Sequence, residues 1–538
     1  MPELVRDPSD ERRLGPNHNQ VDLMLAAESK QPFAVFRPDR MAIADHGDPR
    51  VSRRGMKLVA ELALGEFPGE RVLAPTRPDD ENFHPISVSK GSVARSAAPA
   101  VDRPRFLTHD EATSDPLTLI VQKYGGTSLG SAERVKAVAR RVVETAANRR
   151  VCVVASAMGD TTDELLGLAA EVTPLPHPRE LDMLLTAGER ISIALLSMAI
   201  MDLGRDAISF TASQAGIVTD AAHGKARILD VRSSRVLQAL DEGKVAIVAG
   251  FQGVSSELEP TTLGRGGSDT TAVALAAALE AEACEIYTDV DGVYTADPHV
   301  VPRARKLRRL SFEEMLELAA SGAKVLALRS VEYARNHGLP LHVRSSFADD
   351  EGTWIGKEDK QVDRAIVSGV AHDASQAKVT ILAVPDQPGV AARIFRPLAE
   401  EGANIDMIVQ NVSAEGRTDV SFTLPKEDLA RVEPALERVA RGVGGDGVTV
   451  DAEVAKISLV GAGMKSDPGV AADMFDALAE SGINIEIIST SSIRISCVVR
   501  ASEVERAVRV LHDRFELSEE ALSLETYPPA EDRADGRG

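Results

Sequence analysis

The stretch Thr118-Leu-Ile-Val-Gln-Lys-Tyr-Gly-Gly-Thr-Ser128 joins an apolar run to a lysine and two glycines. Residues 118–123 predict a buried strand, and the apolar periodicity after Ser131 predicts a helix. Glycines between a strand and a helix let the backbone approach a phosphate, and the helix N-terminus supplies amide donors. Lys123 at the strand end would add a full positive charge to a group being transferred. An ordinary strand–helix turn would show the same Gly-Gly pair, and the chain has no GxxxxGK[ST] loop.

Apolar strands and helices continue to alternate downstream. Strands are predicted at 151–155, 245–249, 285–288 and 341–344, and helices at 164–171, 181–203 and 270–279. This order predicts a three-layer α/β domain with a mostly parallel sheet. With 13 Phe, 5 Tyr and 1 Trp in 538 residues, the core must be mainly aliphatic, which suits such a sheet.

A second glycine-rich segment, Thr262-Leu-Gly-Arg-Gly-Gly-Ser-Asp-Thr-Thr271, also opens a predicted helix. Arg265 offers a planar fork that suits a carboxylate or a phosphate. Ser268 and Asp269 stand where the first helical turn would direct them at a ligand. Two such loops in one α/β domain indicate a nucleotide or phosphoryl-transfer site.

Three further segments carry candidate residues. The first, 156–162, follows a predicted strand. The third, 288–298, is rich in acidic and small residues and could recognise a nucleotide at the end of a strand. The second holds Glu189 beside Gly188. Two interpretations of this glutamate stay open: a surface residue that weakens the helix, or a carboxylate that faces a cleft and binds an ammonium group.

A rival motif is Gly126-Thr-Ser128-Leu-Gly130, which matches the GxSxG elbow of serine hydrolases. The strand–helix context fits this motif as well. No HGGG-like segment accompanies it, however, and it leaves the second glycine-rich loop unexplained. The phosphoryl-transfer interpretation is therefore preferred.

The C-terminal part contains an internal repeat. Residues 388–405 recur at 468–485 with 12 of 18 positions identical. Each copy predicts a strand, a Pro-Gly turn, a helix and a second strand. Two copies are too few for a solenoid, so we expect two small α+β units that pair with each other.

Composition restricts the class of protein. The formal charge of −21 argues against a nucleic-acid surface. Three widely spaced cysteines predict neither disulfides nor a zinc site and indicate a reducing cytoplasm. The apolar stretch 181–201 is interrupted by Gly188-Glu189-Arg190, so no membrane span is predicted. Residues 1–116 hold 13 of the 28 prolines and no sustained hydrophobic period, which predicts a disordered or weakly ordered extension.

The motifs KYGGTS, SAMGDTTDELL, LLTAGER, GFQG, TLGRGGSDTTA and YTDVDGVYTADP occur in this order. Together they resemble the aspartokinases of the amino acid kinase superfamily, above all the lysine- and threonine-regulated enzymes of actinobacteria. The C-terminal repeat resembles the paired ferredoxin-like ACT domains of that family. The expected organisation is an extension (1–116), a kinase domain (117–347), a linker (348–375), ACT domains at 376–452 and 453–520, and a flexible tail (521–538).

The resemblance implies ATP-dependent phosphorylation of the β-carboxylate of L-aspartate to 4-phospho-L-aspartate, with Mg²⁺ bound through the ATP phosphates and no protein metal site. This reaction is the first step towards lysine, diaminopimelate, threonine, methionine and isoleucine. Lys123 and Asp269 are the implied catalytic residues. The implied aspartate ligands are Ser156, Thr162, Glu189, Arg265 and Ser268. The implied ATP ligands are Lys123, Tyr124, Gly125, Gly126, Thr288, Asp289, Tyr294 and Lys324. His299 stands where the family often has arginine or lysine, which would weaken nucleotide binding or make it pH-sensitive.

For the ACT domains, the resemblance implies feedback inhibition by lysine, threonine or both across a subunit interface. The implied effector ligands are Asp386, Gly389, Ala391, Asn404, Asp406, Gln410, Asn484 and Ile485. A homo-oligomer that pairs through ACT domains is expected, or an assembly with a shorter chain from the same gene. No nucleic-acid or membrane partner is expected.

Two alternatives remain at this point: an inactive amino-acid sensor, and a superfamily member that acts on glutamate, acetylglutamate or UMP. The intact glycine-rich loops oppose the first, and the AGER segment and the ACT repeats oppose the second. Because Leu117 falls where family members begin, we also hypothesise that residues 1–116 reflect an upstream start assignment.

Overall fold

The structure is a computed structural model and describes residues 117–358, 366–411, 416–465 and 467–518. The predicted extension at 1–116 and the whole predicted tail at 521–538 lie outside these residues. The hypothesis on the start of the chain also concerns residues outside them. Within the described part, the amino acid kinase fold comes first and two ACT units follow.

The kinase domain is built on an eight-stranded sheet, in which only the pairing of β13 with β14 is antiparallel. The predicted mostly parallel sheet is therefore confirmed. In spatial order the strands are β12 (Arg309–Ser311), β14 (Thr353–Gly356), β13 (Leu341–Ser345), β9 (Ala283–Thr288), β1 (Leu119–Tyr124), β2 (Arg150–Ala155), β6 (Val245–Ala249) and β3 (Ala207–Phe210).

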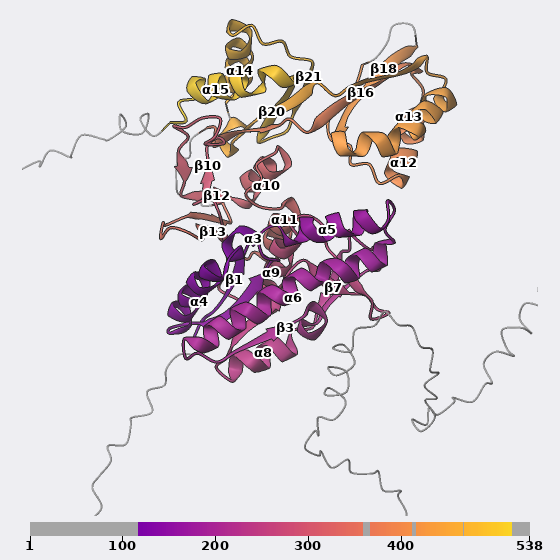
Figure 1. Ribbon diagram of the computed structural model, residues 1–538. Helices are drawn as coiled ribbons and strands as arrows, with labels where there is room; N and C mark the ends of the chain where they lie inside the picture. Colours follow the sequence, from indigo (N-terminus) through magenta and orange to yellow (C-terminus); the bar gives the residue numbers. More distant parts are fainter. Residues whose placement is uncertain (1–116, 359–365, 412–415, 466, 519–538) are drawn as a thin grey trace, which may run out of the picture. The chain divides into compact units, whose positions relative to one another are not determined.

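Helices cover both faces of this sheet and complete the predicted three layers (Figure 1). The strands are apolar on both sides: Val121 and Val154 face one core, whereas Ile120 and Val153 face the other. The helices are α3 (Gly126–Leu129), α4 (Ala132–Ala146), α5 (Thr161–Val172), α6 (Pro178–Asp202), α7 (Ala212–Ala215), α8 (Ser234–Asp241), α9 (Gly267–Ala278), α10 (Phe312–Ala320) and α11 (Leu328–His337).

Two smaller sheets accompany the main one. The first has the order β5 (Ile228–Val231), β4 (Ile217–Thr219), β7 (Gln252–Val254) and β8 (Pro260–Thr262), and it leads into the second glycine-rich loop. The second is a hairpin of β10 (Val293–Tyr294) and β11 (Lys306–Leu307).

Each ACT unit is a four-stranded antiparallel sheet with helices. The first contains β16 (Gln376–Pro385), α12 (Val390–Glu400), β17 (Ile408–Gln410), β18 (Arg417–Pro425), η2 (Lys426–Asp428), α13 (Leu429–Val443) and β19 (Gly447–Asp451). The second contains β20 (Val454–Val460), η3 (Ala462–Lys465), α14 (Gly469–Glu480), β21 (Ile487–Thr490), β22 (Arg494–Arg500), η4 (Ala501–Glu503) and α15 (Val504–Arg514).

The segment expected to be a linker contains two strands. β14 (353–356) belongs to the kinase sheet, and β15 (Gly369–Asp373) pairs with β20 as the edge strand of the second ACT sheet. The first ACT unit is therefore inserted between the first strand of the second unit and the rest of it. The repeat could not reveal this, because β15 lies outside the repeated residues.

Helix α6 is the only helix in the described part that is long and apolar enough to cross a membrane by composition. Half of its apolar window is buried within the kinase domain, where Leu185, Ile193 and Leu196 are buried. The core helix of a water-soluble domain passes the same test, so this is weak evidence for a membrane span.

Candidate active site

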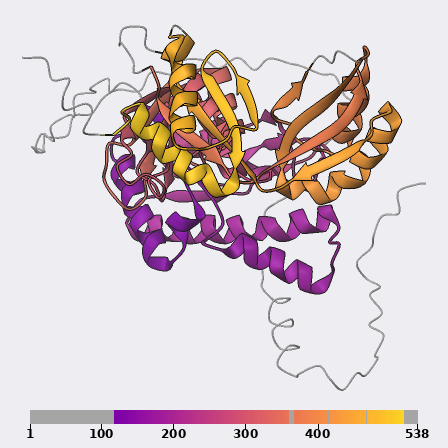
Figure 2. The ribbon, with the colours of Figure 1, turned by 90° about the horizontal axis from the view of Figure 1, so that it is seen from above.

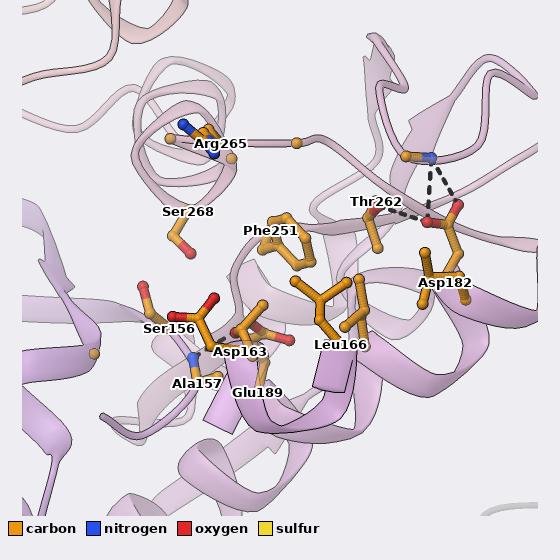
Figure 3. Close-up of a pocket in the computed structure, with 18 of the residues that line it drawn as sticks. Ser156, Ala157, Asp163, Leu166, Asp182, Glu189, Phe251, Thr262, Arg265 and Ser268 are labelled. Carbon is orange, nitrogen blue, oxygen red and sulfur yellow. Dashed lines mark hydrogen bonds between the residues drawn. The ribbon is translucent and has the colours of Figure 1, made fainter. Parts of the chain in front are cut away.

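A cavity of about 640 Å³ opens beyond the carboxyl end of β1, within the size range of ligand pockets. It is lined by residues from both glycine-rich loops, from the loop after β2 and from α6 (Figure 3). All five residues predicted to bind aspartate line it, together with both predicted catalytic residues and both glycines of the first loop: Ser156, Thr162, Glu189, Arg265, Ser268, Lys123, Asp269, Gly125 and Gly126.

Lys123 and Asp269 form an ion pair at the wall of this cavity. The Lys123 Nζ atom lies 2.6 Å from Asp269 Oδ1, and each side chain is only 11% exposed. Lys123 is near the end of β1, and Asp269 is in the first turn of α9. The Lys123 ammonium group is therefore held between the two glycine-rich loops, where it can contact a phosphoryl group.

The position of Glu189 excludes the first of the two interpretations that the sequence left open, a surface residue. Its side chain is 2% exposed and lines the cavity, so it does not lie on the surface of α6. Its oxygens accept hydrogen bonds from the Ala157 amide at 3.3 Å and from Gln252 Nε2 at 3.4 Å. Burial raises the pKa of Glu189 to about 7, although these hydrogen bonds have the opposite effect and lower the pKa. A buried carboxylate without a positive partner is suited to receive an ammonium group.

Glycine is required where the loops meet. A Cβ atom on Gly126 would lie 2.9 Å from the Ala157 carbonyl oxygen, and one on Gly188 would lie 2.8 Å from Ala157 Cβ. These two glycines bring the first loop and α6 against the loop that carries Ser156. Lys123, Ser156 and Glu189 thus reach one cavity because the backbones between them pack closely.

Arg265 does not point into the cavity in this conformation. Its side chain is 94% exposed, and its guanidinium group lies 3.7 Å from Glu427 of the first ACT unit. The Ser268 hydroxyl, in contrast, points towards Ser156 and Asp163 (Figure 3). The role of Arg265 as a carboxylate clamp therefore requires its side chain to rotate inwards, and it stays a prediction.

A second cavity, of about 880 Å³, lies beyond the carboxyl end of β9. It is lined by four of the predicted nucleotide ligands: Thr288, Asp289, Tyr294 and Lys324. His299 also lines it, exposed and 3.0 Å from Asp297 through Nδ1. The predicted effect of His299 on nucleotide binding stays a prediction.

The two cavities are neighbours because β1 and β9 are adjacent parallel strands. Tyr124 pairs with Tyr287, and the Gly125 amide donates to the Tyr287 carbonyl oxygen at 3.3 Å. Ligands of open α/β sheets bind outside the carboxyl ends of such strands. A nucleotide in the second cavity could therefore present its terminal phosphate to Lys123 at the edge of the first.

The expectation for one side chain is wrong, and the rejected hydrolase alternative also finds no support. Tyr124 was expected among the nucleotide ligands, but its ring is fully buried and stacks on Tyr287 at 4.7 Å. Ser128, the nucleophile of the hydrolase alternative, is 1% exposed and shares a 2.6 Å hydrogen bond with the Ser346 hydroxyl, which is not a base. Both side chains belong to the packing beneath the loop.

Comparison with known proteins agrees with this arrangement. The amino acid kinase family profile matches residues 118–345, and ACT domain profiles match 378–441 and 457–515. An aspartokinase of Corynebacterium efficiens is 58% identical over 407 residues, which cover 74% of this chain and 97% of the relative. The chain belongs to the aspartokinase family.

Solved structures of Escherichia coli aspartokinase III resemble the fold. A complex with aspartate and ADP (R-state) has a TM-score of 0.65, and a complex with lysine and aspartate (T-state) has a TM-score of 0.58. Both are 26% identical in sequence, and each match covers 74% of this chain and 99% of the other. The predicted enzyme class and fold are thus confirmed, and the hydrolase and sensor alternatives are set aside.

One wall of the second cavity of this aspartokinase was not predicted from the sequence. Ala371, His372, Asp373 and Ser375, from β15 and the turn after it, line the cavity together with Gly322 and Lys324. Gly322 has φ +112°, and a Cβ atom there would lie 2.1 Å from the His372 carbonyl oxygen. No sequence signal indicates this contact, because it joins the kinase domain to β15, whose partner strand β20 begins 81 residues after β15 ends.

Asp182, a buried carboxylate of α6 that lines the first cavity, was also not predicted from the sequence. It accepts hydrogen bonds from Thr262 Oγ1 at 2.6 Å, from the Gly224 amide at 3.1 Å and from His223 Nδ1 at 2.7 Å (Figure 3). Thr262 begins the second glycine-rich loop. Asp182 therefore fixes the start of the loop that carries Arg265, Ser268 and Asp269.

We expect Asp182→Asn to raise the KM for aspartate about tenfold with a smaller change in kcat, because a buried polar contact contributes about 1–3 kcal/mol. Steady-state kinetics at saturating ATP measures both constants. Asp220→Asn is the matched control: Asp220 accepts from the Arg227 and Ala222 amides in the same region without touching Thr262. Equal effects in both variants would contradict the positioning role of Asp182.

The predicted effector ligands are divided between two environments. Asp386, Gly389, Ala391, Asn404, Gln410 and Asn484 are exposed, whereas Ile485 packs against the core of the second ACT unit. Asp406 is ion-paired with Lys456, which is 1% exposed. Lys456 also donates to the Ala320 carbonyl oxygen at 3.0 Å. Asp406 is thus already paired with the Lys456 ammonium group, which connects both ACT units to the end of α10.

Proposed function

We propose that the protein transfers the γ-phosphate of ATP to the β-carboxylate of L-aspartate and releases ADP and 4-phospho-L-aspartate. The observation that carries this proposal is the Lys123–Asp269 pair, which lines the same cavity as the buried Glu189 carboxylate, while the second cavity lies beyond the adjacent strand β9. The complex of the E. coli enzyme with aspartate and ADP supports the same pair of ligands.

In the proposed complex, Glu189 receives the aspartate ammonium group, and Ser156, Thr162 and Ser268 bind its carboxylates. Arg265 rotates from Glu427 to the α-carboxylate. Thr288, Asp289, Tyr294 and Lys324 hold the nucleotide, and the Gly125-Gly126 backbone faces its phosphates. Each of these residues except Glu427 lines one of the two cavities, which supports the assignment.

The chemical step needs charge neutralisation rather than a strong base. A β-carboxylate oxygen attacks the γ-phosphorus, the new O–P bond forms, and the bond to the β-phosphate oxygen breaks as ADP leaves. Because an aspartate carboxylate is ionised at neutral pH, no proton has to be removed. Lys123 stabilises the negative charge on the transferring group, and Asp269 holds the Lys123 ammonium in position.

We propose that magnesium enters with the nucleotide. Among the described residues, no three His, Cys, Asp or Glu side chains converge to hold a metal ion. Asp289 and Asp291 line the nucleotide cavity and offer the oxygen ligands that Mg²⁺ prefers. When bound to the phosphates, the ion would neutralise their charge.

The test is a turnover assay with ATP and Mg²⁺ in which acyl phosphate is trapped with hydroxylamine. L-aspartate, L-glutamate, N-acetylglutamate and UMP are offered separately as acceptors. We expect the hydroxamate and ADP to appear in equal amounts with aspartate only. Faster turnover with another acceptor, or ADP release without hydroxamate, would contradict the proposal.

We further propose that the product enters the synthesis of lysine, diaminopimelate, threonine, methionine and isoleucine in the cytoplasm, and that lysine, threonine or both inhibit the enzyme. The T-state complex of the E. coli enzyme with lysine supports an amino-acid effector. The exposed residues around Gly389, where α12 begins, and around Asn484 are the proposed binding sites, completed by ACT pairing with another copy or a shorter chain. Activity measured against lysine and threonine, alone and together, identifies the inhibitor.

The route from effector to catalysis is proposed to pass through Lys456. Its ammonium joins Asp406 of the first ACT unit to the last carbonyl groups of α10. The turn after α10 contributes Gly322, Ala323 and Lys324 to the nucleotide cavity. An effector that moves Asp406 would therefore alter the position of the cavity wall.

We expect Lys456→Met to weaken inhibition by the active effector at least fivefold and to leave uninhibited turnover within about twofold, because typical coupling free energies are 1–3 kcal/mol. Inhibition curves measure both effects. Lys378→Met is the matched control, since Lys378 pairs with Glu486 between the ACT units without an ion pair to α10. Equal loss of inhibition in both variants would indicate that contact between the ACT units alone transmits the signal.

A further inference from the structure

One segment of the kinase domain belongs to the hydrophobic core of the second ACT unit. Residues 295–305 join β10 to β11. The second ACT unit, gold and yellow in Figure 2, contributes Val508 and Leu511 of α15 to this core. Four side chains of the 295–305 segment pack in the same cluster: Ala296, Val300, Val301 and Ala304. The position of this segment therefore depends on α15.

The same segment forms part of the wall of the second cavity. The residues that line the cavity here are Tyr294, Ala296, Asp297, Pro298 and His299. Thr295 stands between the first two of them, but it is fully buried and is not a lining residue. Any group that holds Thr295 therefore acts on the cavity wall from behind.

Thr295 is held by its backbone and by its hydroxyl group. Its amide donates to the Arg305 carbonyl oxygen at 2.9 Å, and its carbonyl oxygen accepts from the Val370 amide at 2.7 Å. The hydroxyl donates to the Leu517 carbonyl oxygen at 3.1 Å and accepts from the Arg305 amide at 2.9 Å. His512 Nε2 lies 3.0 Å from the same hydroxyl oxygen. Because a hydroxyl has one proton and two acceptor sites, His512 Nε2 must be a donor here.

His512 is a costly residue for its position. Its side chain is fully buried, and its Nδ1 atom has no hydrogen-bond partner among the described residues. Burial lowers the pKa of His512, so at pH 7 the ring is neutral and carries its one proton on Nε2. A leucine would fill the same space without a buried polar atom that lacks a partner. The bond to Thr295 is the contribution that a leucine could not make.

The other contacts between α15 and the segment are weaker. Arg509 donates to the Val300 carbonyl oxygen at 3.0 Å, and Asp513 forms an ion pair with Arg303. Arg509 and Asp513 are three residues before and one residue after His512, so all three lie on one face of α15. Arg509, Asp513 and Arg303 are exposed, and exposed ion pairs contribute little free energy. Among these contacts, His512 provides the buried and directional one.

We infer that His512 is a positioning residue of the nucleotide site, which acts through Thr295 on the wall from Tyr294 to His299. The inference rests on the proposed function, because it takes the second cavity to be the ATP site. His512 does not line that cavity, so it does not touch the ligand. The first cavity is lined by other segments, so aspartate binding should not depend on His512. The second ACT unit thereby takes part in substrate binding, in addition to any role in inhibition.

His512→Leu in the full-length protein tests the inference. We expect the Kd of MgADP, measured by calorimetry, and the KM for ATP to rise about tenfold, because the buried Thr295 hydroxyl loses a partner. The KM for aspartate and kcat should stay within about twofold. Ser496→Ala is the matched control, since it removes a buried 2.7 Å hydrogen bond to Ser458 within the same ACT sheet. Unchanged MgADP affinity in His512→Leu, or an equal loss in Ser496→Ala, overturns the inference.

A pair of amide variants separates the hydrogen bond from packing, and it decides the matter if His512→Leu does not fold. The side-chain nitrogen of a glutamine reaches the place of Nε2, whereas that of an asparagine reaches only the place of Nδ1. We expect His512→Gln to bind MgADP within about threefold of wild type and His512→Asn to bind it about tenfold more weakly. Equal affinities of the two variants overturn the inference.

The route through Thr295 has its own test. Thr295→Val removes the acceptor of the His512 bond. If His512 acts through this bond, His512→Leu/Thr295→Val should bind MgADP as weakly as Thr295→Val alone. Losses that multiply in the double variant would show that His512 acts by another route, and would overturn the inference.

Lys324→Met distinguishes failure of this inference from failure of the proposed function, because Lys324 lines the second cavity. If the wild type does not bind MgADP, or if Lys324→Met binds it as tightly as the wild type, the second cavity is not the ATP site. The proposed function then fails, and the inference fails with it. If Lys324→Met weakens binding and His512→Leu does not, only the role of His512 is wrong.

Discussion

Replacement of Lys123 by alanine is expected to lower kcat by about 10³-fold and to change the KM for aspartate by less than threefold. The lysine places a positive charge at the wall of the first cavity, where it is held 2.6 Å from Asp269 and is 11% exposed. Removal of one preorganised group that stabilises transition-state charge typically costs 10²–10³ in kcat. Trapping of the acyl phosphate as hydroxamate measures the chemistry directly.

The main complication is the carboxylate left behind. Without its partner, Asp269 would place an uncompensated negative charge next to the incoming phosphates. The double variant Lys123→Ala/Asp269→Asn separates the two causes. If repulsion by Asp269 dominates, the double variant recovers most of the activity. If Lys123 acts on the phosphoryl group, the double variant stays as slow as Lys123→Ala. A Lys123→Ala enzyme with more than a tenth of wild-type kcat would refute the catalytic role.

Replacement of Glu189 by glutamine is expected to raise the KM for aspartate about 10²-fold, because the substrate ammonium group loses its buried partner. In the wild type, Glu189 must be ionised to bind this group, and burial raises its pKa to about 7. The KM for aspartate should therefore rise as the pH falls below 7, by up to tenfold per pH unit. In Glu189→Gln this pH dependence should disappear.

The same variant is expected to stabilise the free enzyme at neutral pH. A carboxyl group whose pKa is raised from 4.5 to about 7 by folding weakens the folded state as the pH rises from 4.5 to 7. At one pKa unit per 1.36 kcal/mol, the stability gained by the variant should grow by about 3 kcal/mol between pH 4.5 and pH 8. Urea denaturation at several pH values measures it.

Glu180→Gln is the control for both effects. Glu180 lies on the same helix, but it is exposed and paired with Arg179. It should change neither the KM for aspartate nor the pH dependence of stability. If the Glu189→Gln enzyme has the wild-type KM for aspartate at every pH, Glu189 does not bind aspartate.

The sequence predicted the elements of the kinase domain well, because local signals determine them. The apolar run of β1, the helix start at Ser131 and the glycines of both loops are all readable within a few residues. Neighbouring parallel strands bring their carboxyl ends together, so the glycine-rich segments after them were expected to meet. The cavities contain most of the predicted residues for this reason.

The failures have a common physical origin. Tyr124 sits in a recognisable motif, but the alternation of β1 directs its ring into the core rather than towards the nucleotide. Asp182 and β15 act through partners 80 to 91 residues away, Thr262 and β20. A single sequence contains no local pattern for such contacts. The outward rotation of Arg265 likewise depends on Glu427, in another domain.

The position of β15 determines the order in which a newly made chain becomes complete. This strand and the turn after it form a wall of the second cavity, the proposed ATP site, yet its partner β20 is synthesised only after the whole first ACT unit. At a synthesis rate of about 5–20 residues per second, β20 is made several seconds after β15. A chain that stops after the first ACT unit would therefore lack the support of its ATP site. Premature termination in this gene is expected to produce an inactive kinase, not one released from feedback.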